Sequence, residues 1–484
     1  MHELQDAALE TARIRGAQYA DIRIGHYRSE SCSVYNGAPG PMDLDESLGY
    51  GIRVLADGAW GFAACDHMDR ESVQRTAAGA VELAKAAGAV NSTPVRQAEE
   101  PAVHDFWQTP VVIDPFAVPL ETKLDLLYRI DKILRADPRI RVSTGQLDWQ
   151  RRHTWLATWS AGSGNSSRIE QVRTICGGGY TAMAVTDGDF QQRSFPNTFA
   201  RQSKSMGWEL IGALKLEDNA ERIREEAIQL LTAPPCPTGP KDIILTGDQM
   251  VLQIHESVGH ASELDRVLGY EANYAGTSFA TTEKLGNFRY GSEIVNLVAD
   301  TTVPTGLATF GYDDDGVAAQ RWPIVRDGIL SGYMTNRETA GAISQSRSRG
   351  CNRSESWSAP PITRIANLSL MPGTWKLADL IADTEDGLLM STNRSWSIDQ
   401  RRLNFQFGCE IGWLIRHGKL AGVVKNPSYQ SITPKFWGSC DAICDHEHWD
   451  LWGVVNCGKG QPTQISEMSH GAAPARFRGV TVGM

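Results

Sequence analysis

A proline-rich stretch near the middle of the chain divides it into two parts. Four of the nine residues at positions 232–240, TAPPCPTGP, are proline. Proline lacks a backbone N–H and its ring clashes with a preceding helical turn, so neither a helix nor a central strand continues through this stretch. A chain of 484 residues is also long for one hydrophobic core. We therefore expect an N-terminal domain at 1–232, a linker at 233–240 and a second domain at 241–484.

The first part alternates between helical and strand patterns in two rounds. Amphipathic segments with a period of 3.6 residues indicate helices, and segments with a period of two indicate strands. Two such rounds predict an α/β domain built from a loosely repeated helix–strand unit. The predicted helices are 3–16, 69–87, 119–136 and 208–231, and the predicted strands are 20–27, 31–36, 47–56, 59–64, 140–149, 153–160 and 167–186.

The second part changes character after Gly269. Short strand patterns and glycine-containing turns follow one another, and a single helical segment at 376–383 interrupts them. Such a succession is typical of antiparallel sheets that close into barrels or pack as sandwiches. We expect a β-rich, mostly antiparallel, barrel- or sandwich-like domain that carries one metal-binding helix. The expected fold class for the whole chain is α+β.

Charge and composition exclude several classes of partner. The net charge is −10 and no cluster of Lys or Arg is present, which argues against a nucleic-acid partner. No apolar run approaches the roughly 20 residues that span a bilayer, and the first residues lack the basic and apolar regions of a signal peptide. Nine cysteines without the spacing of a disulfide scaffold fit a reducing compartment. We expect a cytoplasmic protein with no membrane association.

Two histidines and a glutamate lie close together in TGDQMVLQIHESVGHASELD, residues 246–265. His255, Glu256 and His260 form a pattern one residue longer than the HExxH zinc-hydrolase helix. At about 100° per residue, a spacing of five separates two side chains by about 140° on a regular α-helix, too far for one metal ion. A π-type bulge or a helix end at His260 would bring them together, and Gly259 would ease that distortion. From these residues alone, a metal site and two buried, hydrogen-bonded histidines are equally supported.

A cysteine is a candidate for a third ligand, because catalytic zinc commonly has three protein ligands and one open position. Cys457 follows an apolar strand pattern at 451–455 and precedes Gly458 and Gly460. Glycines at this place would let the backbone approach a metal closely. By itself, however, the pattern favours a small buried residue at a turn.

Taken together, HESVGHASELD (residues 255–265) and VVNCGKGQPT (454–463) resemble the TldD-type, catalytic members of the TldD/PmbA family of zinc metalloproteases. The resemblance extends over most of the chain, through further blocks at 48–85, 311–340 and 368–390. The combination of the histidine motif with the cysteine is specific, whereas the strand blocks alone would be weak.

The resemblance implies a particular site and assembly. His255, His260 and Cys457 would hold one Zn²⁺ per chain, and Glu256 would be the catalytic carboxylate. An N-terminal α/β domain would precede a β-rich domain. The protein would act as a homodimer or as a heterodimer with a PmbA-type subunit, and it would admit peptide substrates in extended form.

These residue types suit a zinc-dependent metallopeptidase that acts on small or unfolded peptides. Two neutral imidazoles and one thiolate leave a zinc site with a net charge of about +1, so the metal would activate a water and polarise the scissile carbonyl. Glu256 would take the proton of the water as general base and deliver it to the leaving amine. Two alternatives remain open: a zinc hydrolase of a non-peptide amide, and a non-catalytic structural subunit of a peptidase complex.

Two acidic residues follow the second histidine. Glu263 and Asp265 match acidic positions of the family, and we expect them to orient an imidazole ligand. The alternative is a solvated helix end, where carboxylates are common.

Two further segments have no assigned role. Cys440, Cys444, His446 and His448 lie within thirteen residues of one another, GSCDAICDHEHWD. On a strand the two histidines would share a face, but packed cysteines and surface histidines are the favoured interpretation over a second metal site. The segment 393–404, rich in Arg and Trp, would line the substrate channel, where an Arg could meet a carboxylate, or would form an exposed loop.

Overall fold

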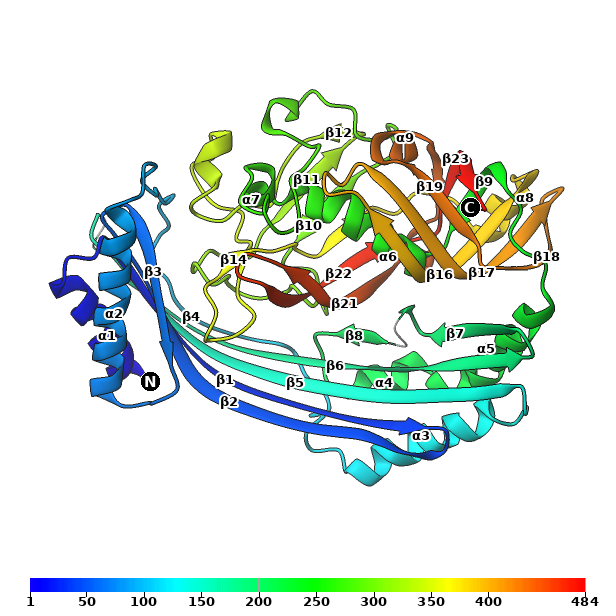
Figure 1. The fold of residues 1–484 in the computed structure, drawn as a ribbon, viewed down its shortest axis with the longest axis horizontal. Helices are drawn as coiled ribbons and strands as arrows, with labels where there is room; N and C mark the ends of the chain where they lie inside the picture. The colour runs from blue at the N-terminus through cyan, green and yellow to red at the C-terminus, as the bar shows by residue number, and fades with distance from the viewer. Residues whose placement is uncertain (163, 165, 199–200, 484) are drawn as a thin grey trace.

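A long, bent β-sheet from the first part of the chain runs beneath shorter strands and helices from the second part (Figure 1). The computed structural model describes residues 1–162, 164, 166–198 and 201–483, so residue 484, which ends the predicted second domain, lies outside the description. Helices accompany sheets that are mostly antiparallel, and the α+β prediction is confirmed.

The long sheet contains eight strands. These are β1 (Tyr19–Tyr35), β2 (Ala38–Ala56), β3 (Ala59–Cys65), β4 (His104–Gln108), β5 (Ile140–Ser160), β6 (Ser166–Thr186), β7 (Asp189–Phe195) and β8 (Gln202–Lys204). Their order is β3-β2-β1-β5-β6-β4, with β7 and β8 also paired to β6. Strand β4 runs parallel to β6, and the other pairs are antiparallel.

Strands β1 and β5 are longer than the sequence predicts. The predicted segments 20–27 and 31–36 are both parts of β1, and 140–149 and 153–160 are both parts of β5. Polar residues interrupt the sequence pattern between these segments. They do not interrupt the strands, because β1 and β5 pair with each other without a break over all 17 residues of β1.

Helices cover the two ends of this sheet. Helices α1 (His2–Ile14) and α2 (Arg70–Gly88) lie at one end, and α3 (Leu120–Leu134), α4 (Glu209–Leu214) and α5 (Leu216–Thr232) lie at the other (Figure 1). The helix predicted at 208–231 is in fact two helices, because Lys215 has a left-handed backbone with φ of 49°. This break lets Ile211 and Leu216 enter the same buried cluster.

The second part of the chain is built on a five-stranded barrel. Its strands are β9 (Gly239–Leu245), β16 (Asp386–Ile398), β17 (Asn404–Arg416), β19 (Ser428–Ile432) and β23 (Ala475–Val482), with β18 (Lys419–Lys425) and β20 (Cys440–Ile443) attached. The order β16-β9-β23-β19-β17 closes because β16 also pairs with β17. Aromatic rings of the barrel pack against helix α9 (Thr433–Gly438), and the ring centroids of Phe436 and Phe477 are 4.0 Å apart.

Smaller elements surround the barrel. They are β10 (Leu297–Asp300), β11 (Arg321–Arg326), β12 (Ile329–Leu330), β13 (Asn352–Arg353), β14 (Ile362–Thr363), β15 (Leu368–Leu370), β21 (Asp450–Lys459), β22 (Gln464–Ala472), α6 (Gly247–Ile254), α7 (Leu264–Val267) and α8 (Leu377–Ala382). Helix α6 follows β9 directly and contacts β16, β21 and β22. The β21–β22 hairpin lies between the barrel and the long sheet (Figure 1).

Buried ion pairs join the long sheet to the second part of the chain. Arg53 of β2 binds Asp21 of β1 at 2.7 Å and Asp315 at 2.6 Å. Arg193 of β7 binds Glu410 of β17 at 2.8 Å. Removing one partner of such a pair costs about 3–5 kcal/mol because the other charge stays buried. The two parts are therefore held in one arrangement, while the domain limits drawn from the proline-rich stretch stay a prediction.

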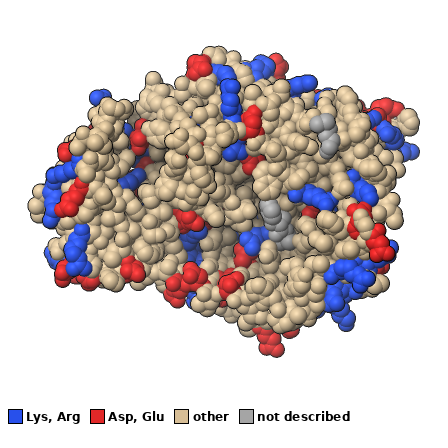
Figure 2. Space-filling model, in the orientation of Figure 1, with Lys and Arg blue, Asp and Glu red and all other residues tan. Residues whose placement is uncertain are grey.

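The surface carries charges of both signs. Lys and Arg side chains are interspersed with Asp and Glu over the face shown in Figure 2. None of the helices in the described ranges combines the length and the apolar character needed to cross a membrane.

Candidate metal centre

The segment with the two histidines departs from a regular α-helix at the first histidine. Helix α6 gives way to one π-helical turn, His255–Gly259, and then to a 3₁₀ turn, His260–Ser262. The backbone N–H of His260 donates to the carbonyl of His255, so five residues complete the turn. The two imidazole rings consequently lie together, with centroids 4.8 Å apart. The predicted widening of the helix is confirmed.

Gly259 is required here by close packing. Its φ of −54° is open to any residue, so conformational freedom is not the reason for a glycine. A Cβ atom added at this position would lie 2.9 Å from Cδ1 and 3.3 Å from Cγ2 of Ile365, which is fully buried. The wide turn is therefore packed against the core at Gly259.

Strand β21 brings Cys457 to the two histidines. Its Sγ atom lies 3.5 Å from Nε2 of His260, and the candidate ligand atoms of all three residues lie within 4.8 Å of one another. The pairing of β21 with β22 shifts register between Val454 and Cys457, an irregularity of the kind that re-aims a side chain. The buried Arg364 donates to the carbonyl of Cys457 at 2.5 Å and fixes the backbone there.

A third histidine orients His255. Nδ1 of His470, on β22, lies 3.0 Å from the carbonyl of Leu368, which can only accept, so this nitrogen carries the proton. Nε2 of His470 is then an acceptor, and Nδ1 of His255, 2.8 Å away, donates to it. This assignment leaves the Nε2 lone pair of His255 free for a cation.

Glu263 orients the other imidazole. Its carboxylate lies 2.8 Å from Nδ1 of His260, which leaves Nε2 of that ring facing Cys457. Asp265 instead accepts hydrogen bonds from the Nζ of Lys459 at 2.7 and 2.8 Å, and the same Nζ lies 3.4 Å from Glu263. Both acidic residues are buried, so the solvated helix end is wrong. Asp265 reaches the ring only through Lys459 and Glu263.

The protonation states suit a metal cation. Burial lowers the pKa of His255 and lowers that of His260 further, so both rings favour the neutral form. Burial alone would raise the pKa of Cys457, but His260 and the Arg364 guanidinium outweigh it and lower this pKa. Two neutral imidazoles and a thiol poised to ionise are donors that bind zinc. The residues present therefore fit such an ion.

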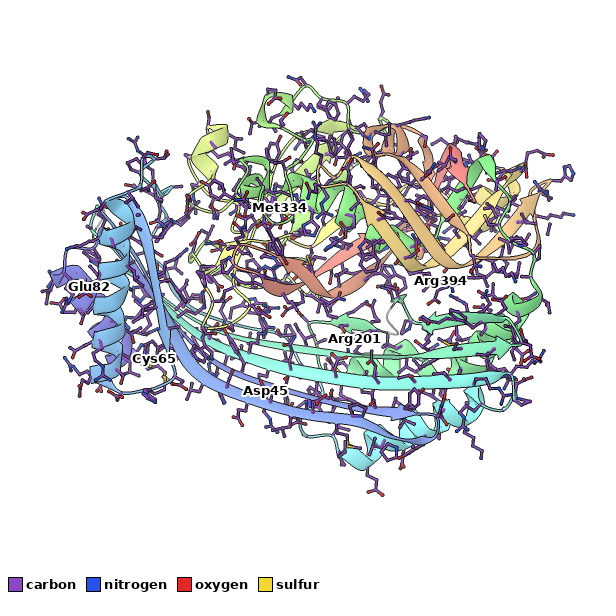
Figure 3. The ribbon with its side chains drawn as sticks, viewed as in Figure 1. Asp45, Cys65, Glu82, Arg201, Met334 and Arg394 are labelled. Carbon is purple, nitrogen blue, oxygen red and sulfur yellow. The ribbon has the colours of Figure 1, made fainter. Side chains whose placement is uncertain are left out.

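Glu256 faces a cavity of about 440 Å³ beside the ligand cluster. Its carboxylate is bound by the guanidinium of Arg402, from the connection between β16 and β17. Arg201, from the side of the long sheet, also lines the cavity, so both parts of the chain form its wall (Figure 3). The segment 393–404 contributes Asn393, Trp396, Ser397, Ile398 and Arg402 to the lining, which favours the channel over the exposed loop.

The remaining candidates lie away from this centre. His446 and His448 are in a 3₁₀ turn and not on a strand, and His448 binds Asp445 at 2.8 Å. Cys440 and Cys444 are buried, unpaired thiols. Within the described residues, groups that could hold a metal are the buried cluster above and the more exposed run Cys65, Asp66 and His67; the segment with Cys440 is in neither.

Sequence reasoning missed His470, Lys459 and Arg402 as individual residues. His470 stands alone in SEMSHGAA and carries no motif, so no local signal identified it. Arg402 lies in the segment 393–404, and the Arg-rich composition of that segment is the only signal for it. Lys459 comes two residues after Cys457. Lysine side chains are almost never fully buried unless they are paired, so nothing in the sequence indicates that this one is buried.

Family models match the chain in two places. The model for the PmbA/TldA metallopeptidase C-terminal domain matches residues 238–484, just over half of the chain. The model for PmbA/TldA metallopeptidase domain 1 matches residues 20–84.

Individual proteins are similar to the whole chain or to part of it. A metalloprotease from Methanocaldococcus jannaschii is 28% identical over 459 residues, which are 93% of this chain and 94% of that protein. A zinc metalloprotease TldD homolog from Saccharolobus solfataricus is 23% identical over 227 residues, 46% of this chain and 48% of that protein. The crystal structure of TldE from Thermococcus kodakarensis has a TM-score of 0.75 at 15% identity, and it covers 99% of this chain and 100% of that one. This last likeness is one of fold.

Proposed function

We propose a zinc-dependent peptidase activity from one premise: the chain belongs to the TldD/PmbA family of metallopeptidases. The observation that carries the proposal is the meeting of His255, His260 and Cys457 beside a cavity that Glu256 also lines. The substrates would be small or unfolded peptides, because the residues that could react lie in a cavity of about 440 Å³ between the two parts of the chain.

The three ligand residues would hold one Zn²⁺ per chain. His255 and His260 would bind it through Nε2, because hydrogen bonds occupy Nδ1 of each ring, and Cys457 would bind through Sγ. A zinc ion here would polarise the scissile carbonyl and lower the pKa of the attacking water. His470 and Glu263 would keep the two rings in the tautomers that ligation needs.

Glu256 would move the proton. It would accept a proton from the attacking water and deliver it to the amine nitrogen as the C–N bond breaks, which leaves one new carboxyl group and one free amine. Its neighbour His255 places it next to the proposed metal. Because Arg402 binds the same carboxylate, that contact has to open before Glu256 can act as a base.

An extended peptide would lie along β21. Residues 453–458 line the cavity, and the edge of β21 opposite β22 is the one that faces the long sheet. Main-chain hydrogen bonds to such an edge would tolerate many substrate sequences. Comparing digestion of a disordered peptide with that of a folded protein tests this, and equal cleavage of both would count against it.

The assembly would be a homodimer or a heterodimer with a PmbA-type subunit, in the cytoplasm. The fold shared with TldE supports a partner of that type. Purification from the native host, followed by identification of the associated subunit and peptides, tests the assembly.

Zinc analysis and peptide hydrolysis on Glu256→Gln test the activity. The variant should keep its zinc, because Glu256 is not a ligand, and should lose about 10²- to 10⁴-fold in hydrolysis. Glu293→Gln removes an exposed carboxylate in the same part of the chain and should behave as wild type. A wild-type protein that binds no zinc refutes the site, and full activity of Glu256→Gln refutes the mechanism.

The same measurements, with a small non-peptide amide added as a second substrate, separate the two alternatives. A structural subunit would retain zinc in wild type and in Glu256→Gln and would hydrolyse no peptide. A zinc hydrolase of a non-peptide amide would spare peptides, cleave a small amide, and lose that activity in Glu256→Gln.

A further inference from the structure

Arg402 is held at the tip of the β16–β17 hairpin by a network of hydrogen bonds. The backbone N–H of Arg402 donates to the carbonyl of Asp399 at 2.9 Å, and the backbone carbonyl of Arg402 accepts from the hydroxyl of Thr433 at 2.9 Å. The backbone N–H groups of Leu403 and Asn404 donate to the Asp399 carboxylate at 2.8 and 3.0 Å. The turn is therefore closed on itself, and it presents the Arg402 side chain from a fixed position.

The guanidinium uses only part of its binding capacity. Nη1 donates to Oε2 of Glu256, while Nε is buried and has no hydrogen-bond partner among the described residues. A guanidinium has five N–H donors in a planar fork that matches the two oxygens of a carboxylate. An unused buried donor costs free energy, so a second acceptor on this guanidinium would be stabilising.

The contact with Glu256 conflicts with the role proposed for that residue. A carboxylate oxygen that already accepts from a guanidinium has less capacity left to accept from an attacking water. A productive complex therefore needs a different acceptor for Arg402. Another carboxylate is the acceptor that best matches both its charge and its fork geometry.

We propose that Arg402 binds the C-terminal carboxylate of the peptide, so that the enzyme removes one or two residues from the C-terminal end. The assignment rests on the proposed peptidase function. Arg402 and Glu256 line the same cavity and are in contact, and an extended chain advances only about 3.3–3.6 Å per residue. A terminus bound by Arg402 thus places a peptide bond beside Glu256. Binding of the terminus also withdraws Arg402 from Glu256, so the base is released only when a substrate is present.

Two peptides of one sequence, a free acid and its C-terminal amide, test the proposal with zinc-loaded protein. The wild type should prefer the acid by about 10- to 100-fold in kcat/KM, because that is the factor expected from one hydrogen-bonded contact between charged groups. In Arg402→Gln the acid-to-amide ratio should fall to about 1, and in Arg402→Lys it should be intermediate. The ratio cancels any general loss of activity that either variant suffers.

Arg401→Gln is the matched control. Arg401 is exposed at the same hairpin tip, so this variant removes the same charge next to the same turn and should keep the wild-type ratio. An amidated peptide with Asp as its last residue should be cleaved as poorly as the plain amide. If this peptide is cleaved as well as the acid, Arg402 recognises an acidic side chain and the exopeptidase assignment is wrong.

Binding to the zinc-depleted protein separates this proposal from the proposed function. By calorimetry, wild type should bind the acid about tenfold more tightly than the amide, and Arg402→Gln should bind both equally. Arg402-dependent binding without any hydrolysis by the zinc-loaded protein would refute the peptidase function and leave the carboxylate site standing. Equal binding of acid and amide by wild type, or an unchanged preference in Arg402→Gln, would overturn the carboxylate site itself.

Discussion

Replacing Glu467 by Gln should loosen the attachment of the cysteine-bearing hairpin to the long sheet. Glu467 lies on β22 beside Ser466, the residue that pairs with Cys457. Its carboxylate is 3.3 Å from Arg152 and 3.0 Å from Arg173, both on the long sheet. Burial would raise the pKa of Glu467, but these guanidinia and that of Arg353 outweigh it and lower the pKa to about 2.

The size of the effect follows from this pKa. A fall from 4.5 to about 2 corresponds to about 3 kcal/mol of stabilisation of the ionised, folded form. For an acid with a lowered pKa, this stability is fully present above pH 4.5 and is lost as the pH falls toward 2. If 484 residues unfold as one unit, 3 kcal/mol is a fall of about 3 °C in the unfolding midpoint.

Thermal unfolding of wild type and Glu467→Gln between pH 8 and pH 3 measures the effect. The variant should melt about 3 °C lower at pH 7 to 8, and the difference should shrink steadily below pH 4.5. Its zinc affinity should also fall, because the strand beside Cys457 is less firmly held. Glu293→Gln, an exposed carboxylate, should show neither change. An unchanged midpoint at pH 7, or a difference that does not shrink on acidification, would refute this account of the ion-pair cluster.

Three further changes have defined outcomes. His470→Phe removes the acceptor that holds the tautomer of His255, so zinc affinity by competition with a chelator should fall about 10- to 100-fold while the fold, by circular dichroism, is kept. Gly259→Ala places a Cβ 2.9 Å from Ile365, and calorimetric scanning should show a loss of about 1–3 kcal/mol with weakened zinc binding. Burial raises the pKa of Glu271 to about 7, so its contribution to stability is present below pH 4.5 and is lost as the pH rises through 7. Glu271→Gln should therefore gain in unfolding midpoint relative to wild type between pH 5 and pH 8, and a constant difference would contradict the assignment.

The parts of the site that the sequence predicts are those governed by local geometry. The five-residue spacing of His255 and His260 requires a widened turn if both rings meet one ion, and the structure has a π turn there. The strand pattern before Cys457 likewise gives the β21 strand on which the cysteine lies. In both cases a rule about neighbouring residues was sufficient.

The parts that could not be predicted depend on residues far apart in the chain. His470 meets His255 across 215 residues, and Arg402 meets Glu256 across 146. Nothing in the sequence near any of these residues indicates its partner. The sequence around Asp265 fits a carboxylate at a solvated helix end as well as one that orients an imidazole. Only the contact with the distant Lys459 identifies Asp265 as a buried, paired carboxylate. The full length of β1 could not be predicted for the same reason. Its polar residues interrupt the sequence pattern, and the strand continues through them because β5 pairs with it there.

The position of β9 in the barrel sets the stage of synthesis at which the candidate metal centre can assemble. Strand β9 leads directly into α6 and the two histidines, but its neighbours in the barrel are β16 and β23, which follow much later in the chain. The thiolate of Cys457 also comes late, on β21. Because such long-range pairing has to wait for the later strands, a growing chain carries the histidines without an assembled centre. The proposed peptidase activity, which needs this centre, would therefore arise only after the barrel has closed.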